Sequence, residues 1–424
     1  MTKEKAYIVA VDMGYGHQRT AFPLRNFSFK GRVINANNYQ GMPREDRKIW
    51  ESSRRLYEFI SRFKRFPLVG GFIFSLFDKL QSIPSYYPKR DLSKPTFALK
   101  RIYAAIRKGW GRDFVEKLKK QKGNLPIITT FFVPAFMAEI FDYPGSIFCV
   151  VCDADISRSW VALNPKESRI KYFAPNEWVV NRLKLYGVKE ENIFLTGYPL
   201  PIENIGGKEM NILKKDLTYR LLNLDPGGSC RKKYEPLIKE KIGSIPDKAD
   251  HILTIMFSIG GAGAQMAIVN QYLKSLKEKI KNKKLRVILS AGIRQGVYDY
   301  FSKKIREYNI EDGAEILFEK EINKYFSAFN QKLRKTDILW TKPSELSFYS
   351  ALGIPIIIAP PIGSQEDFNK KWLLRMKSGV LEENPKYASQ WIFDSLNSGR
   401  FAEAAIQGFI KEEKIGVFNI QKII

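Results

Sequence analysis

The stretch AYIVAVDMGYGH, residues 6–17, decides the fold of this chain. Its first eight residues form an apolar run that only Asp12 interrupts, which is typical of a strand buried on both faces in a parallel sheet. Gly14-Tyr15-Gly16-His17 follows as a glycine turn, and the next segment can begin a helix. Strand, glycine turn and helix in this order predict the opening of a doubly wound α/β domain.

The same alternation of strand and helix runs through most of the chain. In the first half, strands of the buried type are expected at residues 32–36, 126–132, 146–152 and 193–196. After a stretch rich in proline, glycine and charge, the pattern resumes with a strand at 252–258 and continues to a strand at 354–359. We therefore predict two Rossmann-like, doubly wound parallel sheets that face each other across a cleft. The expected divisions are an N-terminal domain at 1–200, a linker at 201–250, and a C-terminal domain at 251–424 whose last helix is a candidate to pack back on the N-terminal domain.

Length and composition exclude several classes of protein. A chain of 424 residues is too long for one small module, and a 44% share of hydrophobic residues excludes wholesale disorder. Three cysteines, Cys149, Cys152 and Cys230, are too few for a disulfide framework and favour a reducing compartment. The longest apolar stretch, residues 66–77, is interrupted by proline and glycine and is too short to span a bilayer. With no export signal at its start, the protein is expected to be cytoplasmic.

Positive charge is concentrated in one region. The formal net charge is +26, and the segment 51–122 holds 18 basic residues against 6 acidic ones. Aromatic and aliphatic side chains interleave with these lysines and arginines, which favours peripheral docking on the cytoplasmic face of an anionic membrane. The competing interpretation is a set of amphipathic helices whose apolar faces pack inward. Nucleic acid is not an expected partner, because no nucleic-acid-binding motif accompanies the charge.

Polar residues follow several of the expected strands of the first half. His17 comes directly after the first glycine turn, where a neutral imidazole could take a proton from a hydroxyl. Asp153-Ala154-Asp155 ends the strand at 146–152, and its two carboxylates are expected on one side. A metal-binding pair is one interpretation of this tripeptide and a chance occurrence is the other.

Two segments of the second half can bind a ligand. Gly260-Gly261-Ala262-Gly263 separates a strand from a helix, so its backbone can approach a diphosphate, although a purely structural turn fits equally well. Ser344 can cap a helix that ends at Gly353, and Gln365-Glu366-Asp367 follows the next strand. These polar groups fit two interpretations. Either they bind a ligand, or Ser344 is an ordinary helix cap and Gln365-Glu366-Asp367 is a solvated helix start.

Taken together, these segments resemble the inverting glycosyltransferases of the group formed by monogalactosyldiacylglycerol synthase, processive diacylglycerol glucosyltransferase and MurG. The resemblance is carried by Gly14 to Arg19, by the series from Cys152-Asp153 to Thr196-Gly197-Tyr198-Pro199, by Gly260 to Gly263, and by the block from Thr341-Lys342 to Asn369. It departs from the family at Phe348, which stands at the position of the donor-binding glutamate. Glu345 lies one helical turn earlier and could take its place.

The resemblance implies the glycosyltransferase-B fold and transfer of a sugar, with inversion, from a nucleotide-diphospho-sugar such as a UDP-sugar to a hydroxyl on a lipid or lipid-linked acceptor. It implies no cofactor and no metal. His17 and Asp153 are the implied catalytic residues, and Gly14, Tyr15 and Gly16 form the acceptor-side loop. The implied donor-binding residues are Gly260, Gly261, Ala262, Gly263, Lys342, Ser344, Glu345, Gly363, Gln365 and Glu366. Two other functions remain open: a sugar-nucleotide 2-epimerase of the same fold, and a non-catalytic protein that binds anionic membranes.

Overall fold

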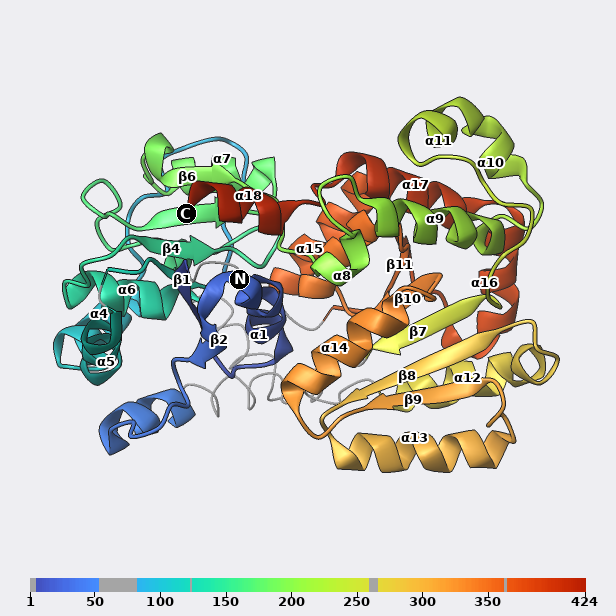
Figure 1. Ribbon diagram of the computed structural model, residues 1–424, viewed down its shortest axis with the longest axis horizontal. Helices are drawn as coiled ribbons and strands as arrows, with labels where there is room; N and C mark the ends of the chain where they lie inside the picture. Colours follow the sequence, from blue (N-terminus) through green and yellow to red (C-terminus); the bar gives the residue numbers. More distant parts are fainter. Residues whose placement is uncertain (1–4, 53–81, 123, 259–265, 362–363) are drawn as a thin grey trace. The chain divides into compact units, whose positions relative to one another are not determined.

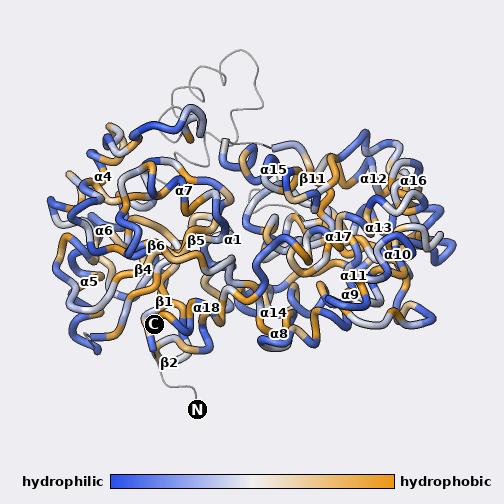
Figure 2. Tube along the Cα trace, turned by 90° about the horizontal axis from the view of Figure 1, so that it is seen from above, coloured by the Kyte–Doolittle hydropathy of each residue, from blue (hydrophilic) through white to orange (hydrophobic). Residues whose placement is uncertain are grey.

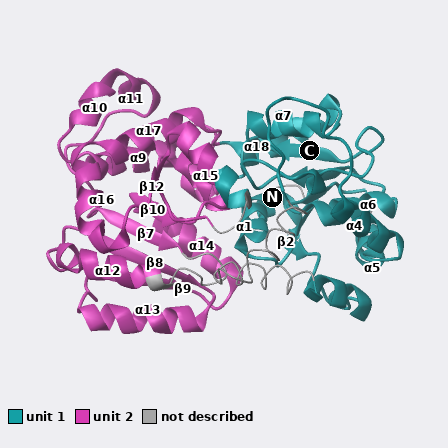
Figure 3. Cartoon of the chain, turned by 180° about the vertical axis from the view of Figure 1, so that it is seen from behind, with its two compact units in different colours: residues 1–199, 362–369, 415–424 teal, residues 200–361, 370–414 magenta. Residues whose placement is uncertain are grey.

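The computed structural model describes residues 5–52, 82–122, 124–258, 266–361 and 364–424. The chain divides into two compact units (Figure 3). Unit 1 consists of residues 1–199, 362–369 and 415–424, and unit 2 consists of residues 200–361 and 370–414. Each unit holds one six-stranded sheet in which every pair of neighbouring strands is parallel (Figure 1).

The sheet of unit 1 has the strand order β2-β1-β3-β4-β5-β6. From β1 the chain passes first to β2 on one side and then to β3 on the other, so the direction of winding reverses beside β1. All five residues of β1 are buried, as the apolar run predicts. The strands are β1 (Ala6–Ala10), β2 (Ser28–Asn35), β3 (Ile127–Thr129), β4 (Ile147–Val150), β5 (Lys171–Ala174) and β6 (Ile193–Leu195).

Crossover connections join the parallel strands of unit 1, and all but the one from β4 to β5 contain a described α-helix. Hydrophobic residues, orange in Figure 2, gather in the interior. The last helix of the chain, α18, belongs to unit 1. The described helices are α1 (Tyr15–Ala21), α4 (Phe97–Arg107), α5 (Arg112–Lys122), α6 (Phe132–Ile140), α7 (Glu177–Leu185) and α18 (Gly416–Ile423), with short 3-10 turns η1 (Phe22–Phe27), η2 (Arg158–Trp160) and η3 (Glu190–Asn192).

The sheet of unit 2 has the order β12-β11-β10-β7-β8-β9. Counted within the unit, this is the order 3-2-1-4-5-6 read from the other edge, which is the strand order of a Rossmann fold. The point of reversal lies between β7 and β10, which pair directly. The strands are β7 (Thr254–Ser258), β8 (Arg286–Gly292), β9 (Ala314–Phe318), β10 (Ile338–Thr341), β11 (Ile356–Ile358) and β12 (Gly379–Leu381).

The helices of unit 2 begin well before its first strand. They are α8 (Ile202–Ile205), α9 (Asn211–Leu224), α10 (Ser229–Lys233), α11 (Glu235–Lys241), α12 (Met266–Lys281), α13 (Gln295–Tyr308), α14 (Ile322–Leu333), α16 (Ala388–Asn397) and α17 (Arg400–Lys411), with 3-10 segments η4 (Glu345–Leu352) and η5 (Pro385–Tyr387). Helix α15 (Ser364–Met376) begins in unit 1 and ends in unit 2.

The segment 201–250, expected as a linker, is mostly helical and belongs to unit 2. Helix α9 buries Leu213, Leu217 and Leu221. Arg220 on the same helix donates to the carbonyls of Thr336 at 2.8 Å and Leu352 at 3.0 Å, beside the ends of β10 and η4. These contacts make the helix part of the core of unit 2, which the high proline, glycine and charge content of the segment did not indicate.

The fold class predicted from the sequence is confirmed: both units are doubly wound parallel α/β domains. Two short strands, β5 and β12, were not predicted. The expected strand at 126–132 ends at Thr129, whose hydroxyl accepts from the Phe131 amide and donates to the Phe131 carbonyl, and this local turn allows α6 to start at Phe132.

Candidate functional site

The glycine turn after β1 directs the chain into α1. Gly14 immediately precedes α1 and has φ 109° and ψ 172°, a conformation that glycine adopts far more easily than other residues. The turn places Tyr15, Gly16 and His17 in the first turn of α1. Because α1 follows the carboxyl end of β1, this is the edge of the sheet at which doubly wound folds bind their ligands.

His17 is held by a residue far away in the sequence. Its Nδ1 lies 2.8 Å from the backbone carbonyl oxygen of Thr130, and the Thr130 hydroxyl donates to the His17 carbonyl at 2.9 Å. A carbonyl only accepts, so this hydrogen bond requires the proton of the neutral ring to be on Nδ1. The lone pair of the imidazole is then on Nε2, which is the arrangement that a general base needs.

Aromatic rings surround the imidazole. The centroid of His17 lies 4.8 Å from that of Phe131 and 6.3 Å from that of Trp160. Trp160 is buried, whereas His17 and Phe131 are half-buried. The rings therefore limit the orientations of the imidazole and leave part of it accessible at the edge of the sheet.

Asp153 lies at the same edge, just after β4. Its Oδ1 accepts from the side-chain amide of Asn369 at 3.1 Å, and Oδ1 of Asn369 in turn accepts from the Ala154 backbone at 2.8 Å. Cys152, the neighbour of Asp153, has its sulfur 3.5 Å from Nδ1 of His17. The two predicted catalytic residues, which are 136 positions apart in the sequence, are thus brought to one edge of the sheet of unit 1.

The second carboxylate of the Asp153-Ala154-Asp155 tripeptide points elsewhere. Asp155 is buried and accepts two hydrogen bonds of 2.8 Å from the guanidinium of Arg182 and one of 2.7 Å from Trp178. The expectation of two carboxylates on one side is therefore wrong, because a buried cation takes up Asp155. In the part of the chain that the structure describes, no group of three or more His, Cys, Asp or Glu side chains could hold a metal ion.

The predicted donor-binding residues of unit 2 follow β10. Lys342 comes directly after that strand and Glu345 begins η4, and both are half-buried. Ser344 occupies the cap position, but its side chain makes no capping hydrogen bond; its carbonyl instead accepts from the Ser347 amide at 2.9 Å. Lys342, Ser344 and Glu345 thus lie together at the carboxyl edge of the sheet of unit 2.

The remaining donor residues are placed less uniformly. Gln365 and Glu366 are in the first turn of α15, in the part of that helix that belongs to unit 1. Gly260 to Gly263 and Gly363 lie outside the described residues. Phe348, at the position of the family glutamate, is 3% exposed and packs against Trp372 with ring centroids 4.8 Å apart. Its side chain is part of the core of unit 2.

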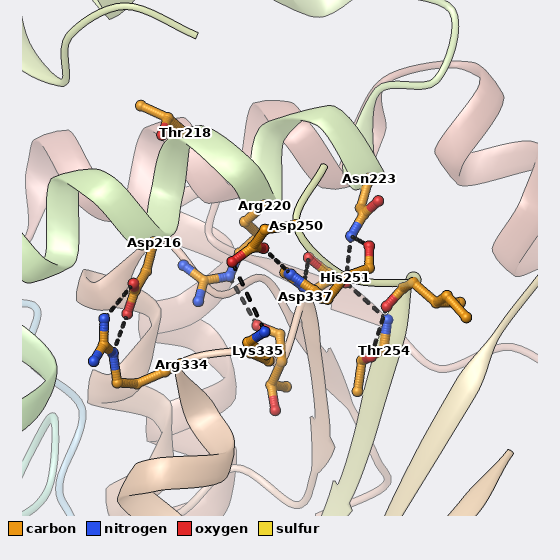
Figure 4. Close-up of polar contacts among 12 residues, drawn as sticks. Asp216, Thr218, Arg220, Asn223, Asp250, His251, Thr254, Arg334, Lys335 and Asp337 are labelled. Atoms are coloured by element: carbon orange, nitrogen blue, oxygen red, sulfur yellow. Dashed lines mark hydrogen bonds and ion pairs between the residues drawn. The ribbon is translucent and has the colours of Figure 1, made fainter. Parts of the chain in front are cut away.

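The second histidine lies at the opposite edge of its sheet. His251 precedes β7, and its ring nitrogens contact Asp250 and, at 3.2 Å, Asp337 (Figure 4). Asp337 is fully buried and also accepts from the Thr254 amide at 2.7 Å. Burial opposes the charged imidazole, but the two carboxylates outweigh it and raise the pKa of His251. Since ligands of doubly wound folds bind at the carboxyl edge, this cluster has the position of a structural group.

Two carboxyl groups of unit 2 were not identified from the sequence. Glu382 follows β12 and accepts from the indole of Trp340 at 2.7 Å; burial raises its pKa to about 7. Glu412 follows α17, and burial raises its pKa to about 8. Neither lies in a motif, and the partners that surround them are more than 30 residues away, so no local signal pointed to them.

The basic region is described only in part, since residues 53–81 lie outside the described chain. Helix α4 buries Leu99, Tyr103 and Ile106, and α5 buries Phe114 and Leu118, so these apolar faces pack inward. Tyr87 and Phe97, by contrast, are each 67% exposed. Among the described residues, no helix is long and apolar enough to cross a membrane.

Comparisons with known proteins give one partial match and a set of distant structures. Residues 246–313 match a family described as a domain of unknown function, DUF6938. No curated protein matches the sequence. The matched range lies in unit 2, begins before β7 and ends at the residue before β9.

Several solved structures are similar over most of the chain. MurG of Acinetobacter baumannii has a TM-score of 0.48 at 12% identity, over 99% of each chain. The UDP-GlcNAc 2-epimerase of Neisseria meningitidis, solved with UDP-GlcNAc, has a TM-score of 0.46 at 14% identity, over 83% of this chain and 86% of that one. A glycosyltransferase of Rickettsia africae has a TM-score of 0.45 at 13% identity, over 100% and 97%. The fold assignment rests on the strand orders of the two sheets.

Proposed function

We propose that this protein is a glycosyltransferase that moves a sugar from a nucleotide-diphospho-sugar, such as a UDP-sugar, to a hydroxyl acceptor with inversion. The observation that carries this proposal is the hydrogen bond between Nδ1 of His17 and the Thr130 carbonyl, since it requires the tautomer whose Nε2 accepts a proton. A histidine prepared in this way at the carboxyl edge of a sheet is suited to activate a hydroxyl.

In the proposed reaction, Nε2 of His17 takes the proton of the acceptor hydroxyl while the hydroxyl oxygen attacks the anomeric carbon. The bond from that carbon to the diphosphate oxygen breaks on the opposite face, and its electron pair leaves with the nucleoside diphosphate. Attack from the opposite face inverts the anomeric configuration. Asp153, oriented by Asn369, is the second candidate for the base.

The donor is assigned to unit 2. The cation of Lys342 at the carboxyl end of β10 would offset the charge of the leaving diphosphate. Phe348 stands at the position of the family's donor-binding glutamate, and Glu345 would take over the role of that glutamate. Gly260 to Gly263 and Ser344 complete the proposed donor contacts of unit 2. In this proposal the sugar nucleotide is a co-substrate, and the reaction uses neither a cofactor nor a metal.

The proposed acceptor is a lipid or lipid-linked alcohol, reached from the cytoplasmic face of a membrane. Two exposed rings, Tyr87 and Phe97, support this part, because lysines and arginines surround them in sequence and one acidic residue, Asp91, lies between them. The exposed basic residues of this stretch are Lys89, Arg90, Lys94, Lys100 and Arg101. Binding to anionic vesicles should weaken as salt rises. Equal binding to neutral vesicles would contradict membrane docking by charge.

A 2-epimerase of the same fold is the second candidate. It would need no separate acceptor, and it would convert the sugar nucleotide while leaving the diphosphate attached at the end of the reaction. Analysis of the products therefore separates the two functions: a transferase releases nucleoside diphosphate only with an acceptor, and an epimerase returns an isomeric sugar nucleotide.

The experiment that tests the proposal begins with a thermal-shift screen of sugar nucleotides, because a ligand of the native state raises the melting temperature. The donor it selects is then assayed with short-chain diacylglycerol. His17→Ala should lower turnover by about 100-fold or more and leave donor binding nearly unchanged. His251→Gln is the matched control, since it alters the other histidine of the chain and should retain turnover. Full turnover in both His17→Ala and Asp153→Asn would exclude the proposed mechanism.

A further inference from the structure

A buried carboxyl group joins three segments of unit 2. Glu412 follows α17 and is 6% exposed. Its two oxygens lie 2.7 and 2.8 Å from the hydroxyl of Ser350 in η4, and one of them lies 2.8 Å from the hydroxyl of Ser378, which precedes β12. Both serines are fully buried. The end of α17, the second half of η4 and the start of β12 therefore meet at one side chain.

The number of available hydrogens indicates the protonation state of this carboxyl. The hydroxyl of Ser350 has one hydrogen but two acceptors within reach, the Glu412 carboxyl and the Ser347 carbonyl at 2.7 Å. An ionised Glu412 would leave one of these acceptors without that hydrogen. A protonated Glu412 donates to Ser350, Ser350 donates to Ser347, and Ser378 donates to the other carboxyl oxygen, so each hydroxyl hydrogen has one acceptor.

The surroundings of Glu412 also favour the neutral acid. Burial is the main cause that raises its pKa to about 8, against the lowering effect of the Ser350 and Ser378 hydroxyls, the Lys414 charge and the Ala351 amide. Among the described residues, Lys414 is the charged side chain that lowers the pKa of Glu412. Its ammonium donates to the backbone carbonyls of Phe409 and Glu412, not to the carboxyl.

The packing around the carboxyl leaves little room for adjustment. Helix α17 packs directly against η4. A Cβ atom added to Gly408 on α17 would lie 2.4 Å from the backbone carbonyl oxygen of Ser350, so glycine is required for this close approach. A segment held this tightly transmits a change at Glu412 to η4, because packed interiors have few voids in which to relax.

We propose that Glu412 is a positioning residue whose protonated carboxyl holds η4, and with it Lys342 and Glu345, at the carboxyl edge of β10. The role of η4 in donor binding rests on the proposed function, whereas the protonation of Glu412 is independent of it. Ionisation of Glu412 would break the chain of hydrogen bonds through Ser350. The donor-binding edge of unit 2 then becomes sensitive to alkaline pH through a residue that touches no ligand.

The protonation state of Glu412 is tested by measuring the stability of unit 2 as a function of pH, without any ligand. Because the pKa of Glu412 is raised from 4.5 to about 8 on folding, its contribution to stability is fully present below pH 4.5 and is lost as pH rises through 8. Over this range the wild-type folding constant of unit 2 should fall by up to about a thousandfold relative to that of Glu412→Gln. Glu413→Gln is the matched control, since Glu413 is exposed and adjacent, and its profile should follow the wild type.

A second variant keeps the test independent of one substitution. Ser378→Ala removes a hydroxyl that favours the ionised form, so it should move the loss of stability to higher pH. If the stability of Glu412→Gln depended on pH in the same way as that of the wild type, the assignment of a proton to Glu412 would be overturned. A Ser378→Ala profile shifted to lower pH would overturn it as well.

The positioning role is tested by titrating the full chain with UDP at pH 7 and pH 9. The wild type and Glu413→Gln should lose affinity by about tenfold or more between these values, and Glu412→Gln should bind with nearly constant affinity. A changed stability profile combined with the same UDP dependence in both variants would mean that Glu412 stabilises unit 2 without positioning η4. If no nucleoside diphosphate binds at either pH, the positioning role and the proposed donor site fail together, while the stability result still decides the proton.

Discussion

Replacing Asp155 by alanine should destabilise unit 1 by about 3–5 kcal/mol, the cost of leaving one partner of a buried ion pair behind. The side chains of Asp155 and Arg182 are 2% and 0% exposed, so the charge that remains cannot reach water. Both hydrogen bonds that the guanidinium donates go to this carboxylate, at 2.8 Å each, and in the described chain its Nη1 has no hydrogen-bond partner. The indole of Trp178 loses its acceptor as well.

A double variant separates the cost of the buried charge from the other costs of replacing Asp155. Asp155→Ala with Arg182→Met removes the carboxylate and the cation together, so the buried charge disappears and much of the lost stability should return. Asp155→Ala alone keeps the cation and should be the less stable of the two. Any remaining loss in the double variant reflects the cavity and the hydrogen bond that Trp178 no longer donates to Asp155.

Hydrogen exchange followed by mass spectrometry is the suitable assay, because it reports each unit separately. Exchange in peptides from β5 and α7 of unit 1 should accelerate in Asp155→Ala, while peptides from β8 of unit 2 serve as the internal control. A loss below about 1 kcal/mol in unit 1, or a double variant less stable than Asp155→Ala, would refute the ion-pair reasoning.

Two further predictions concern unit 2. Arg220→Met should destabilise it by about 3 kcal/mol or more in urea unfolding, because the buried carbonyls of Thr336 and Leu352 lose their donor; an unchanged midpoint would contradict this. His251→Gln should flatten the pH dependence of stability above pH 6.5, since the raised pKa of His251 gives stability that is present below 6.5 and is lost as pH rises through the folded value. A wild-type slope in this variant, measured by thermal unfolding across pH 6–9, would show that the Asp337 contact contributes nothing.

The alternation of apolar strands and helices was sufficient to predict both sheets, because each unit is built from local strand–helix steps. Strand β5 was missed because its four residues, KYFA, begin with a lysine and have too little apolar length to stand out. Strand β12 has three residues and was missed for the same reason. The helices at 201–250 were missed because Gly206, Gly207 and Pro226 resemble a linker locally, whereas the burial of α9 against the rest of unit 2 is a property of the folded chain.

The candidate site was predictable where a residue follows a strand and a glycine turn, as His17 does. Its hydrogen-bond partner was not, because Thr130 is 113 residues away and only the pairing of β1 with β3 brings the two together. The same limit applies to Asp155, whose partner Arg182 lies on the helix after the next strand. A short motif indicates which groups are available for chemistry, but their protonation and orientation depend on contacts between distant segments.

The membership of the last ten residues in unit 1 has a consequence for biosynthesis. In that unit the side-chain amide of Asn419 donates to the Thr196 carbonyl at 2.8 Å, and a Cβ on Gly416 would lie 2.3 Å from the Tyr198 carbonyl oxygen. More than 200 residues separate Pro199 from Ile415, so at 5–20 residues per second the ribosome needs roughly 10–40 s to supply the segment that covers these carbonyls. All residues of unit 2, 200–361 and 370–414, are synthesised before residues 415–424 of unit 1. The amino-terminal unit therefore cannot complete its packing before residues 415–424 are synthesised, and in a nascent chain stalled before residue 415 the carbonyls of Thr196 and Tyr198 would lack these contacts.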